Sequence, residues 1–173
     1  DGINIKDIKI NDYMKHIGYV PQKGILFKGT IKSNIAFGQE AFDEEVVNKA
    51  AEISQAKSFI EKFDQKYDSE INQGGTNVSG GQRQRLSIAR AIAKQPEIFI
   101  FDDSFSALDY KTDKKLRAEL AKNIHATIIV VAQRINTIRH ADQIIVLDKG
   151  NVVGIGTHDE LIQNCEVYLE IAQ

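Results

Sequence analysis

Two short, uninterrupted apolar runs constrain the fold of this chain more than any other feature. They lie at residues 98–101 (Ile-Phe-Ile-Phe) and 127–131 (Thr-Ile-Ile-Val-Val). Runs of this length, without polar alternation, are typical of strands buried on both faces of a parallel sheet. A helical pattern over about 109–123 separates them, so the three segments predict a βαβ unit. The chain is therefore predicted to be an α/β protein with a parallel-sheet core.

The segment before these strands mixes strand and helix patterns. Regularly spaced isoleucines in residues 3–10 predict a short edge strand and a turn, residues 16–20 predict a second strand, and residues 22–40 predict loop and turns. Apolar residues at helical spacing predict one or two amphipathic helices over 43–64, with Asp43 as N-cap, and a further helix over about 80–95. We therefore expect a helical subdomain inserted into the α/β core.

The last third of the chain predicts a hairpin followed by a helix. Residues 143–147 and 152–155 read as two strands around a Lys-Gly-Asn turn. Thr157 and Glu160 have the spacing of a capping box that opens the final helix. Three segments of one domain follow from this order: a core edge at 1–39, a helical subdomain at 40–95, and the rest of the core at 96–173.

Charge and hydropathy exclude several classes of protein. The 22 basic and 24 acidic residues give a net charge of −2, which argues against a nucleic-acid-binding chain. The longest apolar run, at 128–132, is far shorter than the ~18 residues of a membrane span. A single cysteine, Cys165, cannot form an internal disulfide. The chain opens on Asp1 within an apparent strand, so we expect it to be a piece of a longer polypeptide.

The run at residues 77–86 (Asn-Val-Ser-Gly-Gly-Gln-Arg-Gln-Arg-Leu) indicates a phosphate site. Ser79 can N-cap the following helix, and Gly80 and Gly81 leave its first amides bare. Bare amides at the positive end of a helix dipole attract anions. A Ser-capped helix with a glycine-rich approach would also carry an isolated Ser-Gly-Gly, but the full run over residues 79–93 favours the phosphate site.

Two carboxylates, Asp102 and Asp103, follow the first apolar run. The carboxyl end of a parallel strand is where α/β sheets place their ligands. A carboxylate there can hold Mg²⁺ against nucleotide phosphates, and the second can orient or deprotonate a water molecule. Taken alone, the pair could equally be a polar strand end that caps the next turn.

Together these motifs resemble the nucleotide-binding domain of ATP-binding cassette (ABC) proteins. The matching segments, in chain order, are the Q-loop at 20–22, the signature motif at 78–82, Walker B at 98–102, the D-loop at 106–109 and the switch at 131–134. Residues 25–35 and 156–161 are similar to the exporter type. The resemblance implies an ABC ATPase fold, which is P-loop NTPase-like, with a parallel-sheet core, an inserted α-helical subdomain and a missing N-terminal part.

The resemblance also implies cofactors, site residues and partners. ATP and Mg²⁺ are the implied cofactors; Gln22, Ser79, Gly80, Gly81, Gln82 and Asp109 would bind the nucleotide, Asp102 and Gln22 the metal, and Asp103 and Gln133 would be catalytic. The implied partners are a transmembrane domain, on the same or another chain, and a second nucleotide-binding domain in a head-to-tail dimer. The implied function is ATP-driven efflux at the cytoplasmic face of the cell membrane, with multidrug or lipid-like cargo.

Three departures from the family pattern shape this expectation. No GxxxxGK[ST] phosphate loop occurs, so the isolated chain is expected to be an inactive, truncated piece of the ATPase. Asp103 stands where catalytic sites carry Glu, which withdraws the carboxylate by about 1.5 Å and can cost ~10²-fold in rate. Gln133 stands where the switch His is found. The last two together resemble the weakly hydrolysing half of a heterodimeric exporter rather than a functional homodimer.

Two other functions fit the same motifs. A soluble ABC ATPase that acts on DNA or ribosomes would share them, but would be marked by coiled-coil insertions or tandem cassettes, and the sequence has neither. A non-enzymatic interaction module would describe the isolated chain if the phosphate loop is supplied elsewhere.

Overall fold

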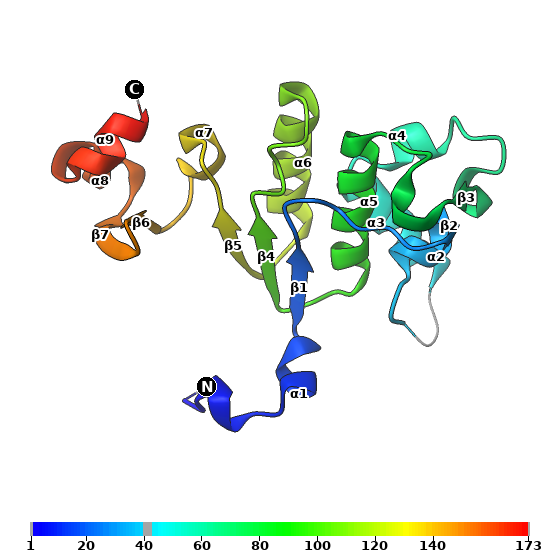
Figure 1. Ribbon diagram of the computed structural model, residues 1–173, viewed down its shortest axis with the longest axis horizontal. Coiled ribbons are helices and arrows are strands. Elements are labelled where there is room, and N and C mark those ends of the chain that lie inside the picture. Colours follow the sequence, from blue (N-terminus) through cyan, green and yellow to red (C-terminus); the bar gives the residue numbers. More distant parts are fainter. Residues whose placement is uncertain (1, 40–42, 173) are drawn as a thin grey trace. The chain divides into compact units, whose positions relative to one another are not determined.

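The computed structural model describes residues 2–39 and 43–172, and the chain forms two compact units, Asp1–Ile129 and Val130–Gln173 (Figure 1). Each unit has its own architecture. The first contains a parallel sheet and most of the helices, and the second contains a β-hairpin with helices packed on it.

The core sheet has the strand order β1-β4-β5, formed by β1 (Ile17–Val20), β4 (Ile98–Asp102) and β5 (Thr127–Val131). β1 and β4 are parallel, with Ile17 opposite Ile98 and Val20 opposite Phe101. Helix α6 (Tyr110–Asn123) connects β4 to β5. The predicted α/β class with a parallel-sheet core is therefore confirmed.

The prediction that both apolar strands are buried on both faces is wrong. In β5, the side chains of Ile128, Ile129 and Val131 are 39%, 48% and 52% exposed. In β4, Phe99 and Phe101 are buried while the alternate residues of the strand are only half-buried. An apolar run shows that a strand can be buried on both faces, but its burial depends on which helices or strands pack against those faces. Within the described residues, β5 ends the strand order of its sheet and its apolar face is not covered.

Three helices form the block beside the sheet, and the predicted helices at 43–64 and 80–95 are confirmed (Figure 1). Helix α3 (Glu44–Ile53) begins after Asp43, whose carboxylate accepts a hydrogen bond from the amide of Glu45. A short α4 (Lys57–Ile60) follows, and α5 (Gly80–Ala93) packs against α3. Their contact faces are aliphatic and buried, including Val47, Ala50, Ile53, Leu86, Ile88 and Ile92.

Two predictions in the first 40 residues are wrong. The opening segment forms a 3-10 turn η1 (Ile5–Asp7) and helix α1 (Ile10–Met14) instead of an edge strand, because Asn4 caps the turn and no strand pairs with it in the described residues. The segment predicted as loop contains β2 (Gly29–Thr30) and helix α2 (Ile31–Ile35). Thr30 and Ser33 form a capping box there, in which Ser33 stands at the position that usually carries Glu or Gln.

Short elements complete the first unit. β2 pairs antiparallel with β3 (Glu70–Ile71), and the 3-10 turns η2 (Lys66–Asp68) and η3 (Gln73–Gly75) flank β3. Helix α2 packs against both α3 and α5. The segment that follows the Q-loop is thereby tied to the helical block.

The second unit contains α7 (Ile135–Ile138), β6 (Ile144–Asp148), β7 (Asn151–Gly156), α8 (His158–Asn164) and α9 (Glu166–Ala172). β6 and β7 form the predicted antiparallel hairpin, and Thr157 and Glu160 form the predicted capping box. The core of this unit consists of Ile144, Val146, Leu161, Cys165 and Tyr168. In the ranges that the structure describes, none of the helices has the length and hydropathy needed to cross a membrane.

Candidate functional site

The carboxyl ends of β1 and β4 bring three predicted site residues together. Because the strands are parallel and in register, the chain leaves both at the same edge of the sheet. The Nε2 atom of Gln22 donates a hydrogen bond to Oδ2 of Asp103, 3.1 Å away. Asp102 lies next to it as the last residue of β4. The structure therefore brings Gln22 to the adjacent pair Asp102 and Asp103, which lies about 80 residues further along the sequence.

Tyr19 is a neighbour of this cluster that the sequence reasoning missed. Its hydroxyl donates a hydrogen bond to Oδ2 of Asp102 at 3.0 Å, from the adjacent strand. That hydrogen bond raises the pKa of the Tyr19 hydroxyl above its ordinary value. The contact occupies one oxygen of Asp102 and leaves the other available to a ligand. No local signal could have found it, because it depends on the pairing of β1 with β4.

The backbone at Asp103 turns sharply as the chain leaves the sheet. Asp103 has φ of +44°, a left-handed conformation that aspartate tolerates better than most residues. The Ser106 hydroxyl donates to the Asp103 carbonyl at 2.7 Å, and the Ser104 hydroxyl donates to the Val20 carbonyl at 2.7 Å. These bonds stabilise a strained turn of the kind found at functional sites.

The oxygen atoms of this cluster suit a hard divalent cation. Mg²⁺ is usually bound by one or two carboxylates together with substrate phosphates and water. Asp102 retains a free carboxylate oxygen, and Gln22 retains its amide oxygen because its nitrogen faces Asp103. Within the described ranges, no group of three or more His, Cys, Asp and Glu side chains could hold a metal by itself. The donor set therefore fits a Mg²⁺ that is shared with phosphates.

The N-terminus of α5 carries the predicted phosphate motif. Ser79 and Gln82 form a capping box: Ser79 Oγ accepts from the Gln82 amide at 3.2 Å, and Gln82 Oε1 accepts from the Ser79 amide at 2.9 Å. The amides of Gly80 and Gly81 have no acceptor among the described residues. A Cβ at position 80 would meet open space, whereas one at 81 would lie 3.6 Å from the Ala107 carbonyl. Gly80 is exposed and Gly81 is half-buried, so their free amides lie near the surface, as an anion site requires.

Asp109 has a structural task in this chain. It is the N-cap of α6, and its carboxylate accepts a hydrogen bond from the Thr112 amide at 3.0 Å. Hydrogen bonding by Thr112 lowers the pKa of Asp109 below its ordinary value. A nucleotide contact by Asp109 remains a prediction. Gln133 lies in the second unit, exposed in the segment between β5 and α7, and its catalytic role likewise remains a prediction.

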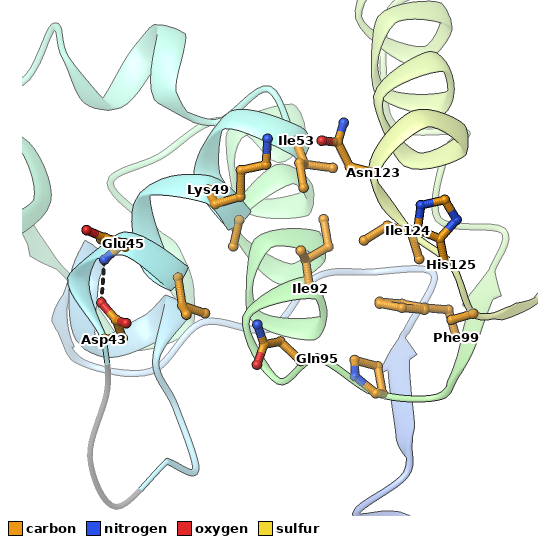
Figure 2. Close-up of a pocket in the computed structure, with 14 residues that line it drawn as sticks. Asp43, Glu45, Lys49, Ile53, Ile92, Gln95, Phe99, Asn123, Ile124 and His125 are labelled. Carbon is orange, nitrogen blue, oxygen red and sulfur yellow. Dashed lines mark hydrogen bonds between the residues drawn. The ribbon is translucent and has the colours of Figure 1, made fainter.

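A pocket of about 430 Å³ lies elsewhere in the first unit (Figure 2). Figure 2 shows Lys49 of α3, Ile92 of α5, Phe99 of β4 and His125 of the α6–β5 connection on its walls. Its lining mixes apolar residues with charged and polar ones, and none of the predicted site residues in the described ranges contributes to it. The predicted site residues gather instead at the sheet edge, so the cluster of Gln22, Asp102 and Asp103 is the better candidate site.

An α/β domain with carboxylates at a parallel-sheet edge and a separate glycine-rich helix N-terminus defines a nucleotide-binding class of protein. A family model described as ABC transporter matches residues 1–106. The chain belongs to the ABC transporter family.

Three similar proteins illustrate the relationship. An ABC transporter ATP-binding protein of Mycobacterium tuberculosis (strain H37Rv) is 43% identical over 176 residues, which cover 99% of this chain and 30% of that protein. An export ATP-binding/permease protein of Rickettsia conorii is 39% identical over 99% of this chain and 30% of its own length. The solved structure of a bacterial Atm1-family ABC exporter with ATP bound matches with a TM-score of 0.94 at 36% identity, over 99% of this chain and 30% of that chain. The chain thus spans less than a third of each of these proteins.

Proposed function

We propose that this chain is the ATP-binding and ATP-hydrolysing domain of an ABC exporter, with residues 1–39, 40–95 and 96–173 as core edge, helical subdomain and remaining core. The observation that carries the proposal is the cluster of Gln22, Asp102 and Asp103 at the carboxyl ends of two parallel strands. The match to an ATP-bound exporter structure over 99% of the chain supports the same assignment.

In this proposal the cofactors are ATP and Mg²⁺. Asp102 and Gln22 would hold the metal through oxygen atoms that the cluster leaves free. Mg²⁺, when bound, screens the charge of the phosphates. Asp103 orients the attacking water, and Gln22 fixes the position of the Asp103 carboxylate through their hydrogen bond. Gln133 would contact the γ-phosphate as a neutral hydrogen-bonding group.

The free amides of Gly80 and Gly81, at the N-terminus of α5, support a head-to-tail dimer with a second nucleotide-binding domain. Ser79, Gly80, Gly81 and Gln82 would bind the ATP held by the partner, because an exposed helix N-terminus is best satisfied by an anion from outside the chain. Asp109 would contribute to the same interface. The partner is proposed to be a different chain, because Asp103 and Gln133 resemble the weakly hydrolysing half of a heterodimer.

The partner on the membrane side is proposed to be a transmembrane domain, which would place this chain at the cytoplasmic face of the cell membrane. Ile25 and Phe37 expose more than half of their side chains, and Phe27 stacks on Phe37 with ring centroids 4.3 Å apart. An exposed aromatic cluster of this kind is typical of a docking surface. Through this surface, ATP-driven closure of the dimer would move the transmembrane domain and drive efflux of a multidrug or lipid-like cargo.

Single-turnover ATP hydrolysis by the assembled transporter tests this proposal. Asp103→Asn should change total turnover little, because little flux passes through this site, whereas the matching acid-to-amide change in the partner should stop nearly all of it. The double change Asp103→Glu with Gln133→His should add hydrolysis here, because a longer carboxylate and an imidazole can reach the water and the γ-phosphate.

The outcomes separate the parts of the proposal. A large loss from Asp103→Asn alone would mean that this site is catalytic and that the weak-half assignment is wrong. No ATP hydrolysis by any form of the assembled transporter would contradict the ATPase assignment itself. The chain alone is the negative control, because without a GxxxxGK[ST] loop it should not bind Mg-ATP at micromolar concentration.

A further inference from the structure

We call α5 the signature helix, because it begins within the signature motif. Among its polar side chains that contact another element, Gln84 is the most completely buried. It lies on α5, one and a half turns after Ser79, and is 1% exposed. Its Oε1 atom accepts a hydrogen bond from the Gly24 amide at 2.8 Å, and its Nε2 atom donates to the Pro21 carbonyl at 3.0 Å. A buried amide that makes both bonds holds its partners in one geometry, because breaking either bond leaves an unpaired polar group.

The two bonds from Gln84 bracket Gln22. Pro21 lies on one side of Gln22 in the sequence and Gly24 closes the same loop two residues later. Gln22 in turn donates to Asp103 at 3.1 Å. The contacts therefore form a continuous path from α5, through the loop at 21–24, to the carboxylate of Asp103 just after β4.

Gly24 is the second element of this link. A Cβ at this position would lie 3.0 Å from the Arg83 carbonyl and 3.1 Å from Cβ of Ser87, so only glycine lets the loop lie directly on α5. The close approach is what brings the Gly24 amide within reach of Gln84. Loop and helix are thus complementary in both shape and hydrogen bonding.

We infer that Gln84 is a positioning residue that sets Gln22 against Asp103 and makes the Q-loop and the signature helix move as one body. The inference rests on the proposed function, because it assigns Gln22 to the bound metal. A ligand at the N-terminus of α5 then influences the metal site of the same chain through a buried amide. Gln84 itself touches neither ligand.

The test measures nucleotide binding to this chain within the assembled transporter, by 8-azido-ATP photolabelling with and without Mg²⁺. Labelling is scored on this chain alone, so the partner site does not contribute. Gln22→Ala should weaken the gain that Mg²⁺ gives to labelling, by about 10-fold, the usual effect of disturbing a metal ligand or its support. Gln84→Met, which keeps the side-chain volume and removes both hydrogen bonds, should weaken it to the same extent, while labelling without Mg²⁺ stays unchanged.

The double variant Gln22→Ala with Gln84→Met decides between positioning and general stabilisation. If Gln84 acts through Gln22, the gain in labelling from Mg²⁺ should be reduced no more in the double variant than in Gln22→Ala. If the two residues act independently, the two reductions should multiply. Gly24→Ala should reproduce Gln84→Met, because it pushes the loop off α5 from the other side, and Gln163→Met, an exposed site in the second unit, should change nothing.

Hydrogen exchange gives a readout that does not depend on nucleotide. The Gly24 amide should lose protection in Gln84→Met and keep it in Gln163→Met, the exposed control in the second unit. An unchanged Gly24 amide in Gln84→Met, or multiplicative losses in the double variant, would overturn the inference. An absence of any Mg²⁺-dependent labelling in the unsubstituted transporter would instead contradict the proposed function.

Discussion

Replacement of Arg90 should destabilise the first unit more than any surface arginine does. Its guanidinium donates three hydrogen bonds, to the Asn34 carbonyl at 2.8 Å, to Asn34 Oδ1 at 2.9 Å and to the Ile25 carbonyl at 2.8 Å. The same group lies 5.1 Å and 5.3 Å from the ring centroids of Phe27 and Phe37. None of these partners is a carboxylate, and burial lowers the pKa of Arg90 to about 10.

The cost of Arg90→Met follows from which acceptors are left unpaired. Asn34 Oδ1 keeps a bond from the Phe27 amide, and the Ile25 residue is exposed enough for water to replace the guanidinium. The Asn34 carbonyl, in a residue that is 1% exposed, loses its donor, which costs about 1–3 kcal/mol. Loss of the two ring contacts adds about 0.5–1 kcal/mol each, and relief from burying a charge offsets part of the sum. We expect a net loss of about 2–3 kcal/mol in the free energy of unfolding.

Urea unfolding of the chain, followed by far-UV circular dichroism, measures this loss. With a slope of about 2 kcal/mol per molar urea, the midpoint should fall by about 1 M. The urea midpoint of Arg90→Lys should lie between those of the unsubstituted chain and Arg90→Met, because a single ammonium cannot make all the hydrogen bonds of a guanidinium. Arg134→Met, at an exposed position in the second unit, is the matched control and should stay within about 0.5 kcal/mol. An Arg90→Met midpoint that coincides with that of the control would refute the reasoning.

Two further changes test the site and the second unit. Ser79→Arg should lower steady-state ATP turnover of the assembled transporter at least about 10-fold, because it removes the cap of α5 and fills the proposed site for the partner's ATP. Ser79→Thr should keep most of the turnover. Equal turnover in both variants would contradict the proposal that Ser79 binds the ATP held by the partner. Tyr168→Phe should destabilise the second unit by about 1 kcal/mol in thermal unfolding, because the hydroxyl of the buried Tyr168 makes a 2.9 Å hydrogen bond with Nδ1 of His158. An unchanged melting temperature would show that this hydrogen bond makes no net contribution to stability.

The sequence by itself determined the family, the core strands and the longer helices, but it missed α1, β2 and α2. Helices α3, α5 and α8 follow from apolar spacing and from caps at Asp43, Ser79 and Thr157, and α6 follows from the helical pattern between the two apolar runs, because these signals act within a few residues of one another. The signature run and the paired carboxylates indicate the ABC resemblance without any tertiary contact. The sequence also placed β1, β4 and β5 of the core sheet correctly, although it overestimated the burial of β5.

The tertiary structure alone decided which of these residues meet. Gln22 reaches Asp103, Tyr19 reaches Asp102 and Gln84 reaches the loop at 21–24 across sequence separations of 60 residues or more. In the sequence, Gln84 looks like one more polar position on an amphipathic helix. It is buried because a glycine lets a distant loop lie on it, and no local pattern records which distant segment will cover a helix face.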